Sequence, residues 1–341
     1  MAAMPRGVLW PFVLVALAAA PAVAHGQAPQ PAQPAPPPPP APATEPAPPE
    51  PASGRIQLVV ERAGGRQATV LAGARFRVRG IVKPYVAGQR ATLRFYRGDR
   101  KLHARRVTIR RGKAAGQFLV AYRPRRAGRL TIRASHRATA ALATIRARPR
   151  SVDVLPRRVG PGARGGAVRI LQRRLAALGY VVGRRGRFDA RTARAVLALR
   201  KVTGMHRTSS AGTPVMRALA RGAGRFRVRF PRHGRHVEAD LSRQVVALIG
   251  RGSRVERVYP ISSGSPATPT VRGSFRVYRR SPGTNAKGMV HSSYFIGGYA
   301  MHGYASVPVY PASHGCLRLP VPDALPIFRW VRFGTPVDVY A

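Results

Sequence analysis

The sequence predicts a multi-domain, mainly β protein with a small helical module in its middle. Three changes of pattern along the 341 residues predict this fold class. Residues 55–150 alternate apolar and polar side chains in short runs, residues 151–222 repeat apolar side chains at steps of three and four, and residues 225–341 alternate again. Alternation is typical of strands, and steps of three and four are typical of helices. We therefore expect a β-sandwich, a helical module and a C-terminal β-rich domain.

The chain is strongly basic. Its 60 Lys and Arg outnumber its 11 Asp and Glu, for a formal net charge of +49. This excess favours an anionic polymer as partner, either a cell-envelope polymer or a nucleic acid. However, 55 of the basic residues are Arg, beside many Ala, Gly and Pro, as a GC-rich coding background would produce. A solvated surface without an anionic partner therefore stays an alternative.

Cys316 is the only cysteine. This count excludes an intramolecular disulfide framework, a Cys-based zinc site and an iron–sulfur cluster. Several histidines are scattered along the chain without metal-ligand spacing. We expect neither a metal nor an organic cofactor.

The first 24 residues are typical of an export signal. Arg6 supplies a positive charge, residues 8–20 are apolar, and Ala-Val-Ala at 22–24 fits a small-x-small cleavage site. Two prolines interrupt the apolar run, which disfavours a membrane-spanning helix of about 20 residues. We expect export to the periplasm or cell wall, with membrane contact only if the signal stays attached as an anchor.

Residues 25–54 consist mainly of Pro, Ala, Gln and Glu and predict a semi-rigid spacer. The sandwich is predicted over 55–150, where alternating runs are separated by turn signals. Its fold is expected to be Ig-like, with Arg at most outward positions, and no catalytic constellation is visible in it. The alternating runs lie at 56–60, 75–79, 92–96, 107–109 and 130–133.

The helical module is predicted over 151–222. One helix carries Val168, Leu171, Leu175 and Leu178 on one face and is expected to end at Gly179. A second helix places Thr192, Ala195, Val196 and Leu199 on one face.

This stretch resembles the peptidoglycan-binding domain 1 family, which implies a three-helix fold and binding to the cell wall. The resemblance is carried by Gly162-x-x-Gly165, Leu171-Gln172-x-x-Leu175, Gly179-Tyr180, Phe188 and Thr192-x-x-Ala195-Val196.

The C-terminal region, 225–341, carries a cysteine and histidines at close spacing. Met301-His302-Gly303 is followed by Ser313-His314-Gly315-Cys316-Leu317-Arg318. A thiol needs a nearby base or a positive field to act as a nucleophile at neutral pH. Two histidines and one arginine close to the only cysteine can supply both.

These motifs resemble the signature of the L,D-transpeptidases of the YkuD type, over nearly the whole of residues 225–341. Carried over to this sequence, the resemblance implies that Cys316 is the nucleophile and His302 its base, with His314 as a further catalytic residue. Because Gly303 follows His302, we expect a backbone carbonyl to orient the imidazole. The N–H groups of Gly315 and Cys316 are expected to form the oxyanion hole.

The remaining site residues are expected to bind the substrate. Arg318 supplies positive potential and a planar fork for a substrate carboxylate. The other predicted substrate-binding residues are Ser313, Tyr299 and Gly303, with Tyr294 as a further candidate for the pocket wall.

The resemblance implies acyl transfer in two steps. The thiolate attacks the carbonyl of the third residue of a peptidoglycan tetrapeptide stem and releases the terminal D-alanine. An amine of a neighbouring stem then resolves the thioester and forms a 3→3 cross-link. Stem peptides and anionic wall polymers are the implied partners, and β-lactams of the carbapenem class are candidate covalent inhibitors.

Two other functions stay open on the sequence alone. An L,D-carboxypeptidase would resolve the same acyl-enzyme with water, and a wall-binding protein without catalysis would use only the helical module and the basic surface. A nucleic acid is not expected as partner, because the export signal and the lack of aromatic-interleaved basic motifs disfavour it.

Overall fold

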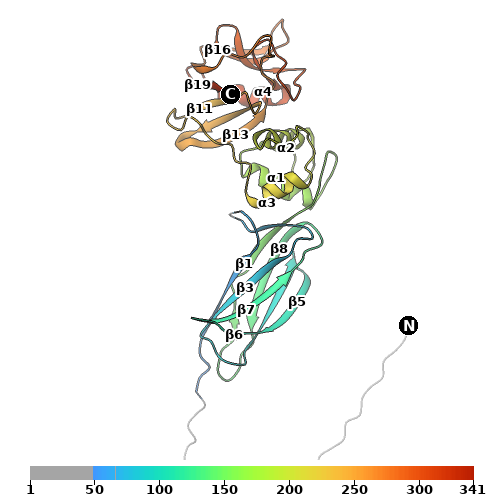
Figure 1. Cartoon of the computed structure of the whole chain (residues 1–341), viewed down its shortest axis with the longest axis vertical. Coiled ribbons are helices and arrows are strands. Elements are labelled where there is room, and N and C mark those ends of the chain that lie inside the picture. Colours follow the sequence, from blue (N-terminus) through green and yellow to red (C-terminus); the bar gives the residue numbers. More distant parts are fainter. Residues whose placement is uncertain (1–48, 66) are drawn as a thin grey trace, which may run out of the picture. The chain divides into compact units, whose positions relative to one another are not determined.

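The computed structural model describes residues 49–65 and 67–341. The predicted export signal, 1–24, and most of the predicted spacer, 25–54, lie outside the described residues. The described chain is mainly β, as predicted, and contains four α-helices, of which the last was not predicted (Figure 1).

The first described region is a β-sandwich. Its two sheets have the strand orders β1-β3-β7-β6 and β2-β10-β8-β4-β5, with β9 paired to β8. Alternate side chains such as Phe76, Val78, Leu93 and Phe95 are fully buried in one apolar core that both sheets contribute to, as the alternation predicts. The strands are β1 (Arg55–Glu61), β2 (Thr69–Leu71), β3 (Phe76–Lys83), β4 (Arg90–Arg97), β5 (Arg100–Thr108), β6 (Arg110–Arg111), β7 (Gly116–Tyr122), β8 (Gly128–His136), β9 (Ile145–Arg146) and β10 (Arg150–Leu155).

The sandwich extends beyond its predicted end at residue 150. Strand β10 pairs antiparallel with β8 and parallel with β2, so it belongs to the second sheet. The predicted start of the helical module at 151 is therefore wrong. The segment Val152 to Leu155 is apolar enough for either element, and its strand partners are far away in the sequence.

Three helices form the module that follows, α1 (Gly166–Ala176), α2 (Ala190–Val202) and α3 (Thr213–Arg221). Gly179 ends the first helix as predicted. Its φ is +91°, its N–H donates to the carbonyl of Ala176, and the N–H of Tyr180 donates to that of Leu175. This pair of bonds is a Schellman motif, which favours glycine because of the positive φ.

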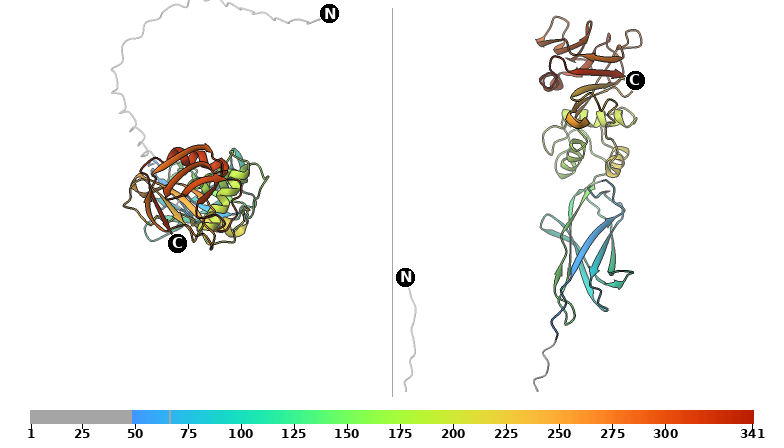
Figure 2. Two further views of the ribbon diagram at one scale, coloured as in Figure 1. Left: turned by 90° about the horizontal axis from the view of Figure 1, so that it is seen from above. Right: turned by 90° about the vertical axis from the view of Figure 1, so that its left-hand side faces the viewer.

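The C-terminal region contains two further sheets. Their strand orders are β13-β12-β11-β19-β14 and β15-β16-β17-β18, and a buried cluster that includes Val246, Phe295 and Met301 draws on both (Figures 1 and 2). Helix α4 (Val321–Trp330) packs on β16 and β17. The strands are β11 (His236–Asp240), β12 (Val245–Gly250), β13 (Arg254–Pro260), β14 (Gly273–Arg276), β15 (Arg279–Thr284), β16 (Val290–Ile296), β17 (Tyr299–Tyr304), β18 (Leu317–Pro320) and β19 (Pro336–Tyr340).

The helical module and the C-terminal region share one apolar core. Val245, Ala247 and Ile249 of β12 and Val258 of β13 lie in the same buried cluster as the module's helices. The two predicted domains are therefore continuous in packing, although their sequence patterns differ. Within the described residues, no helix combines the length and apolar character needed to cross a membrane.

A single carboxylate caps the start of α2. One oxygen of Asp189 accepts from the N–H of Thr192 at 2.9 Å and the other from the N–H of Arg184 at 2.7 Å. Burial would raise the pKa of Asp189, but these N–H donors lower it below its usual value. Because the folded state then favours the carboxylate, its contribution is present near neutral pH and is lost as the pH falls through the lowered pKa.

We expect Asp189→Ala to lower the free energy of unfolding by about 1 kcal/mol at pH 7, which is typical of a lost N-cap. Urea unfolding followed by circular dichroism at pH 7 and pH 3 measures this. The matched control is Asp99→Ala, at an exposed turn residue, which should change the stability little. A deficit of the Asp189 variant that stays as large at pH 3 would contradict the capping role.

Candidate active site

Parallel pairing of two strands brings the predicted nucleophile and base to one face of a sheet. In the register of β17 and β18, Met301 pairs with Leu317 and His302 with Arg318. Side chains alternate across a sheet, so Met301 and Leu317 point into the core on one side. Cys316, one residue before β18, and His302 therefore lie on the opposite side as diagonal neighbours.

The thiol of Cys316 is partly buried. It packs against the cluster of Met289, Tyr294 and Ala300. The N–H of Ala300 donates to Sγ at 3.4 Å, and Sγ lies 3.7 Å from the carbonyl oxygen of Gly298. Burial raises the pKa of the Cys316 thiol, and the opposing effects of the Ala300 N–H, Arg318 and Lys287 are smaller. The resting group at pH 7 is therefore the neutral thiol, which differs from the thiolate that the sequence led us to expect.

The imidazole of His302 is buried, with only 3% of its surface exposed. Its Nδ1 lies 2.9 Å from the carbonyl oxygen of Gly303, so a backbone carbonyl orients the ring, as expected from the glycine after it. Because a carbonyl can only accept, Nδ1 carries the hydrogen and Nε2 keeps its lone pair. Burial lowers the pKa of His302, and Arg318 lowers it further. The ring is thus neutral at pH 7 and able to take a proton at Nε2.

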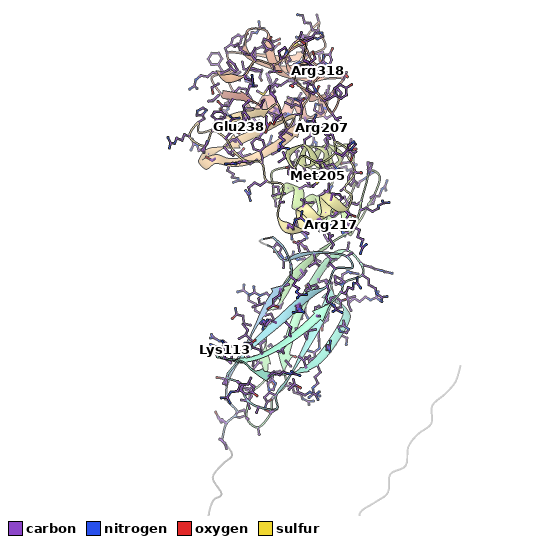
Figure 3. The ribbon with its side chains drawn as sticks, viewed as in Figure 1. Lys113, Met205, Arg207, Arg217, Glu238 and Arg318 are labelled. Atoms are coloured by element: carbon purple, nitrogen blue, oxygen red, sulfur yellow. The ribbon has the colours of Figure 1, made fainter. Side chains whose placement is uncertain are left out.

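Arg318 is held by an aromatic ring that the sequence analysis did not single out. Its guanidinium carbon lies 4.4 Å from the centre of the Tyr304 ring, and Tyr304 meets His302 edge-on at 5.7 Å. Arg318 also pairs with His302 in the β17–β18 register, so it lies on the same face as the imidazole and Cys316. Figure 3 labels Arg318 in the C-terminal region. A cation there favours a negative group in the site, such as a substrate carboxylate or a developing oxyanion.

The loop before Cys316 is stabilised from within by Ser313. The Ser313 hydroxyl donates to the carbonyl of Cys316 at 2.6 Å and accepts from the N–H of Gly315 at 3.1 Å. Ser313 is 1% exposed, so it shapes the loop and is not placed for the substrate contact predicted for it. The same bond occupies the Gly315 N–H that was predicted for the oxyanion hole.

Gly315 is required at its position for two reasons. Its φ is +106°, and a Cβ there would lie 1.9 Å from the ring of Tyr299. Tyr299 therefore packs directly on the cysteine loop, at the edge of the predicted site. The neighbouring His314 is exposed, in contrast to the buried His302.

Gly303 does not line the site with its own surface. It is buried, and a Cβ there would lie 2.8 Å from the Cβ of Ala324 on helix α4. The close approach of this helix explains the glycine. Its contribution to the site is the carbonyl that orients His302, which corrects the predicted substrate contact.

A turn before β14 supports the cysteine loop from outside. The Thr270 hydroxyl donates to the carbonyl of Gly315 at 2.7 Å and accepts from the N–H of Gly264 at 2.9 Å. The Thr268 hydroxyl donates to the carbonyl of Ser313 at 3.0 Å. Both threonines belong to a Thr-Pro-Thr turn at 268–270, and their role could not be assigned from the sequence. Lys287, whose charge acts on the Cys316 thiol, and Met289, in the cluster against which that thiol packs, could not be identified from the sequence.

Comparison with known proteins gives this region a family. Residues 234–339 match the family model of the L,D-transpeptidase catalytic domain, YkuD, and residues 164–219 match that of a peptidoglycan binding domain. An L,D-transpeptidase from Xylanimonas cellulosilytica DSM 15894 is 33% identical over 98% of that chain and 54% of this one, with a TM-score of 0.49. The chain belongs to the L,D-transpeptidase family. Both predicted resemblances are thus confirmed.

Other solved structures match this L,D-transpeptidase over a shorter part. The Ldtfm–avibactam carbamoyl enzyme is 27% identical, over 31% of this chain and 49% of that one, with a TM-score of 0.29. A cysteine-to-serine mutant of an Enterococcus faecium L,D-transpeptidase is 25% identical, over 31% of this chain and 50% of that one, with a TM-score of 0.28. Among curated proteins, none matches significantly.

We expect Gly315→Ala to destabilise the L,D-transpeptidase and to abolish acylation of Cys316. The backbone strain alone costs about 1–3 kcal/mol, and the contact with Tyr299 adds to it. The matched control is Gly283→Ala, where φ is +72° but nothing lies within 4 Å, so that only the backbone cost remains. Thermal unfolding of both variants separates the two contributions.

The double variant Gly315→Ala/Tyr299→Ala isolates the contact further. It should recover the stability lost to the steric contact and keep the backbone cost seen in Gly283→Ala. Equal stability of Gly315→Ala and Gly283→Ala would show that the Tyr299 ring yields easily and does not fix the loop.

Proposed function

We propose that this L,D-transpeptidase is exported and forms 3→3 cross-links in peptidoglycan, with Cys316 as nucleophile and His302 as general base. The observation that carries the proposal is the placement of both side chains on one face of the β17–β18 pair, with Nδ1 of His302 bound to the Gly303 carbonyl. The bond at Nδ1 leaves Nε2 free to accept a proton. An extracytoplasmic location follows from domains that act on peptidoglycan.

The first half-reaction acylates the enzyme. Nε2 of His302 takes the thiol proton as Sγ attacks the carbonyl carbon of the third residue of a tetrapeptide stem. The tetrahedral oxyanion then collapses, the carbon–nitrogen bond to the terminal D-alanine breaks, and the imidazolium returns the proton to the leaving amine. The products are a thioester on Cys316 and free D-alanine.

The second half-reaction transfers the acyl group. The side-chain amine of a neighbouring stem attacks the thioester and loses a proton to His302. The carbon–sulfur bond then breaks, and the imidazolium returns the proton to the departing Cys316 thiolate. Attack by water instead of the amine would give a tripeptide, which is the L,D-carboxypeptidase outcome.

We assign the oxyanion to the N–H of Cys316, aided by the positive charge of Arg318. The N–H of Gly315 can join only when its bond to the Ser313 hydroxyl opens. His314, which is exposed, remains a candidate for contact with substrate groups, and Tyr299 for the pocket wall. The wall-binding role of the helical module and the pairing of surface arginines with anionic wall polymers are parts of the same proposal.

Replacing His302 and His314 in turn should distinguish the proposed general base from the exposed histidine. We expect His302→Gln to slow acylation of Cys316 by about 10²- to 10⁴-fold, the range typical of general base catalysis. Intact-protein mass spectrometry after mixing with a tetrapeptide donor or a carbapenem measures the acylation rate. His314→Gln is the matched control and should lose less than about tenfold, since it affects contacts and not the proton transfer.

Two further results of this experiment decide the proposal. Cys316→Ala must show no adduct, and an adduct elsewhere on the chain would refute Cys316 as nucleophile. A wild-type protein that binds isolated wall but never forms an adduct would favour the wall-binding function without catalysis. Cross-linked dimer among the products supports transfer, whereas tripeptide alone indicates hydrolysis.

The two pKa shifts predict opposite pH behaviour for two reactions of Cys316. Alkylation by iodoacetamide requires the thiolate, so the raised pKa should make it slower at pH 7 than for free cysteine, with a midpoint at higher pH than that of free cysteine. Acylation by substrate requires neutral His302, so it should keep its full rate at pH 7 and fall only as the pH drops below the lowered pKa of His302. Stopped-flow alkylation and acylation rates between pH 5 and 10 measure both. Fast alkylation at pH 7 would instead indicate a resting thiolate–imidazolium pair.

A further inference from the structure

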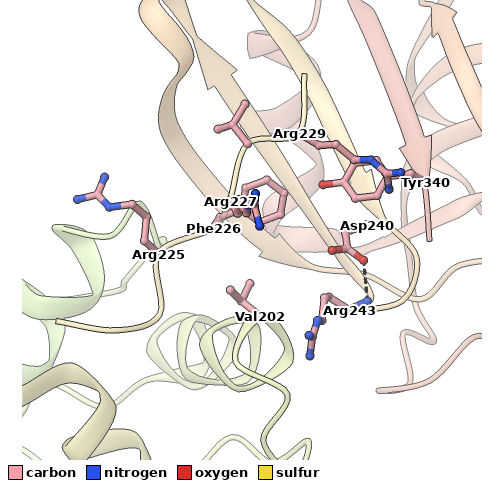
Figure 4. Close-up of a pocket in the computed structure, with 9 residues that line it drawn as sticks. Val202, Arg225, Phe226, Arg227, Arg229, Asp240, Arg243 and Tyr340 are labelled. Atoms are coloured by element: carbon pink, nitrogen blue, oxygen red, sulfur yellow. Dashed lines mark hydrogen bonds between the residues drawn. The ribbon is translucent and has the colours of Figure 1, made fainter. Parts of the chain in front are cut away.

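The junction between the helical module and the catalytic region contains defined polar contacts in addition to the shared core. A cavity of about 490 Å³ also lies there, lined by Arg225, Arg227, Arg229, Arg243 and Asp240 among others (Figure 4). Its guanidinium groups do not converge: Arg229 stacks on Tyr340, and Arg225 points away from Asp240 and Arg243. The informative contacts are those made by α2 and the loop after it.

Lys201, at the end of α2, is buried with 2% of its surface exposed. Its Nζ donates to the carbonyl of Gln244 at 3.1 Å and to that of Ile261 at 2.7 Å. Burial, aided by nearby Arg207, lowers the pKa of Lys201 to about 7. Either protonation state retains enough N–H donors for both carbonyls, so the helix holds these two backbone segments across the neutral pH range.

The segment that begins at Ile261 forms backbone hydrogen bonds with the residues on both sides of the cysteine loop and so fixes the position of that loop. Ser262 and Arg318 exchange two backbone hydrogen bonds, at 3.1 and 2.9 Å, and the N–H groups of Ala312 and Ser313 both donate to the carbonyl of Ser263 at 2.9 Å. The Gln244 side chain in turn binds the backbone N–H and the hydroxyl of Ser263. A shift of the segment held by Lys201 would therefore shift the loop that carries Cys316.

Arg207 holds the same loop at its other end. One of its terminal nitrogens donates to the carbonyl of Val309 at 2.7 Å and the other to that of Ser242 at 3.3 Å. Val309 lies in the connection between β17 and Ser313, so this arginine of the helical module fixes the chain that leads into the cysteine loop.

A third contact of the helical module acts on the strand that carries His302. Arg194 of α2 binds both carboxylate oxygens of Asp323, at 2.6 and 3.0 Å, and this carboxylate is 3% exposed. Asp323 lies in the first turn of α4, and the next residue, Ala324, is the one that approaches Gly303 closely. The position of α4 therefore sets the position of the strand whose Gly303 carbonyl orients His302.

We propose that the helical module is an integral part of the catalytic unit, in which Lys201, Arg207 and Arg194 are positioning residues for the Cys316 loop and the His302 strand. The inference rests on the proposed function, since it concerns the alignment of these two groups for proton transfer and attack. It adds a role to the module that is independent of whether the module binds the cell wall.

The test uses full-length variants and the carbapenem acylation of Cys316, followed by intact-protein mass at a temperature where each variant is folded. For Arg207→Gln we expect the maximal acylation rate to fall by about tenfold or more, because misplacement of reacting groups by about 1 Å can cost up to about 100-fold. The carbapenem concentration that gives half the maximal rate should change little. The pH midpoint of acylation should shift, because displacement of the loop changes the surroundings of His302. Arg217→Gln, an exposed arginine of the same module, should leave the rate, the midpoint and the unfolding temperature unchanged.

Lys201→Met is a second variant, for which we expect the same loss of acylation rate. If this substitution of a buried residue prevents folding, Arg207→Gln still tests the proposal. A lowered unfolding temperature of Arg207→Gln with an unchanged acylation rate and pH midpoint would overturn the proposal, because the module would then only stabilise the fold. A wild-type protein that is never acylated would instead refute the proposed function, and the two failures are thus distinct.

Discussion

The parallel pairing of β17 with β18 is the constraint on which the candidate site depends. Parallel neighbours cannot be joined by a tight hairpin, so the chain between them must make a long crossover, and this crossover carries the Ser-His-Gly-Cys loop. The same register sends Met301 and Leu317 into the core and His302 and Cys316 to the opposite face. Apolar burial on one side of the sheet therefore fixes the relative position of the reactive groups on the other.

Four of the 11 acidic residues of this basic chain are buried in the fold. Asp153, Glu238, Asp323 and Asp338 are each at most 2% exposed. Each is paired with cations or bound by several donors; Asp323, for example, is bound by Arg194. Leaving such a buried carboxylate unpaired would be costly, so these pairs are structural. The remaining arginines give the surface its positive field, which suits an anionic polymer but does not specify one.

The motif residues could be predicted from the sequence because the chemistry of a thiol beside histidines is local, whereas their environment could not. The extra strand β10 depends on partners in β8 and β2, and α4 contains Pro326 inside the helix, which disfavours a helix prediction. Whether Ser313 meets substrate or its own loop depends on burial that only the fold determines. The directions of the pKa shifts of Cys316 and His302 could not be predicted either, because desolvation dominates both. Nor could the burial and backbone contacts of Lys201, since in the sequence it is an ordinary lysine of an amphipathic helix.

A neutral thiol on the same sheet face as a neutral imidazole has a chemical consequence for an enzyme that we propose to be exported. Oxidants and alkylating agents attack the thiolate, so a raised pKa keeps the only cysteine of the chain in its less reactive form until a substrate arrives. In the mechanism that we propose, the proton moves to His302 as the new bond forms, and the positive charge of Arg318 stabilises the developing oxyanion more than it stabilises any resting charge. Burial thus makes reactivity conditional on the substrate, and the polar groups that surround the loop keep the geometry ready for it.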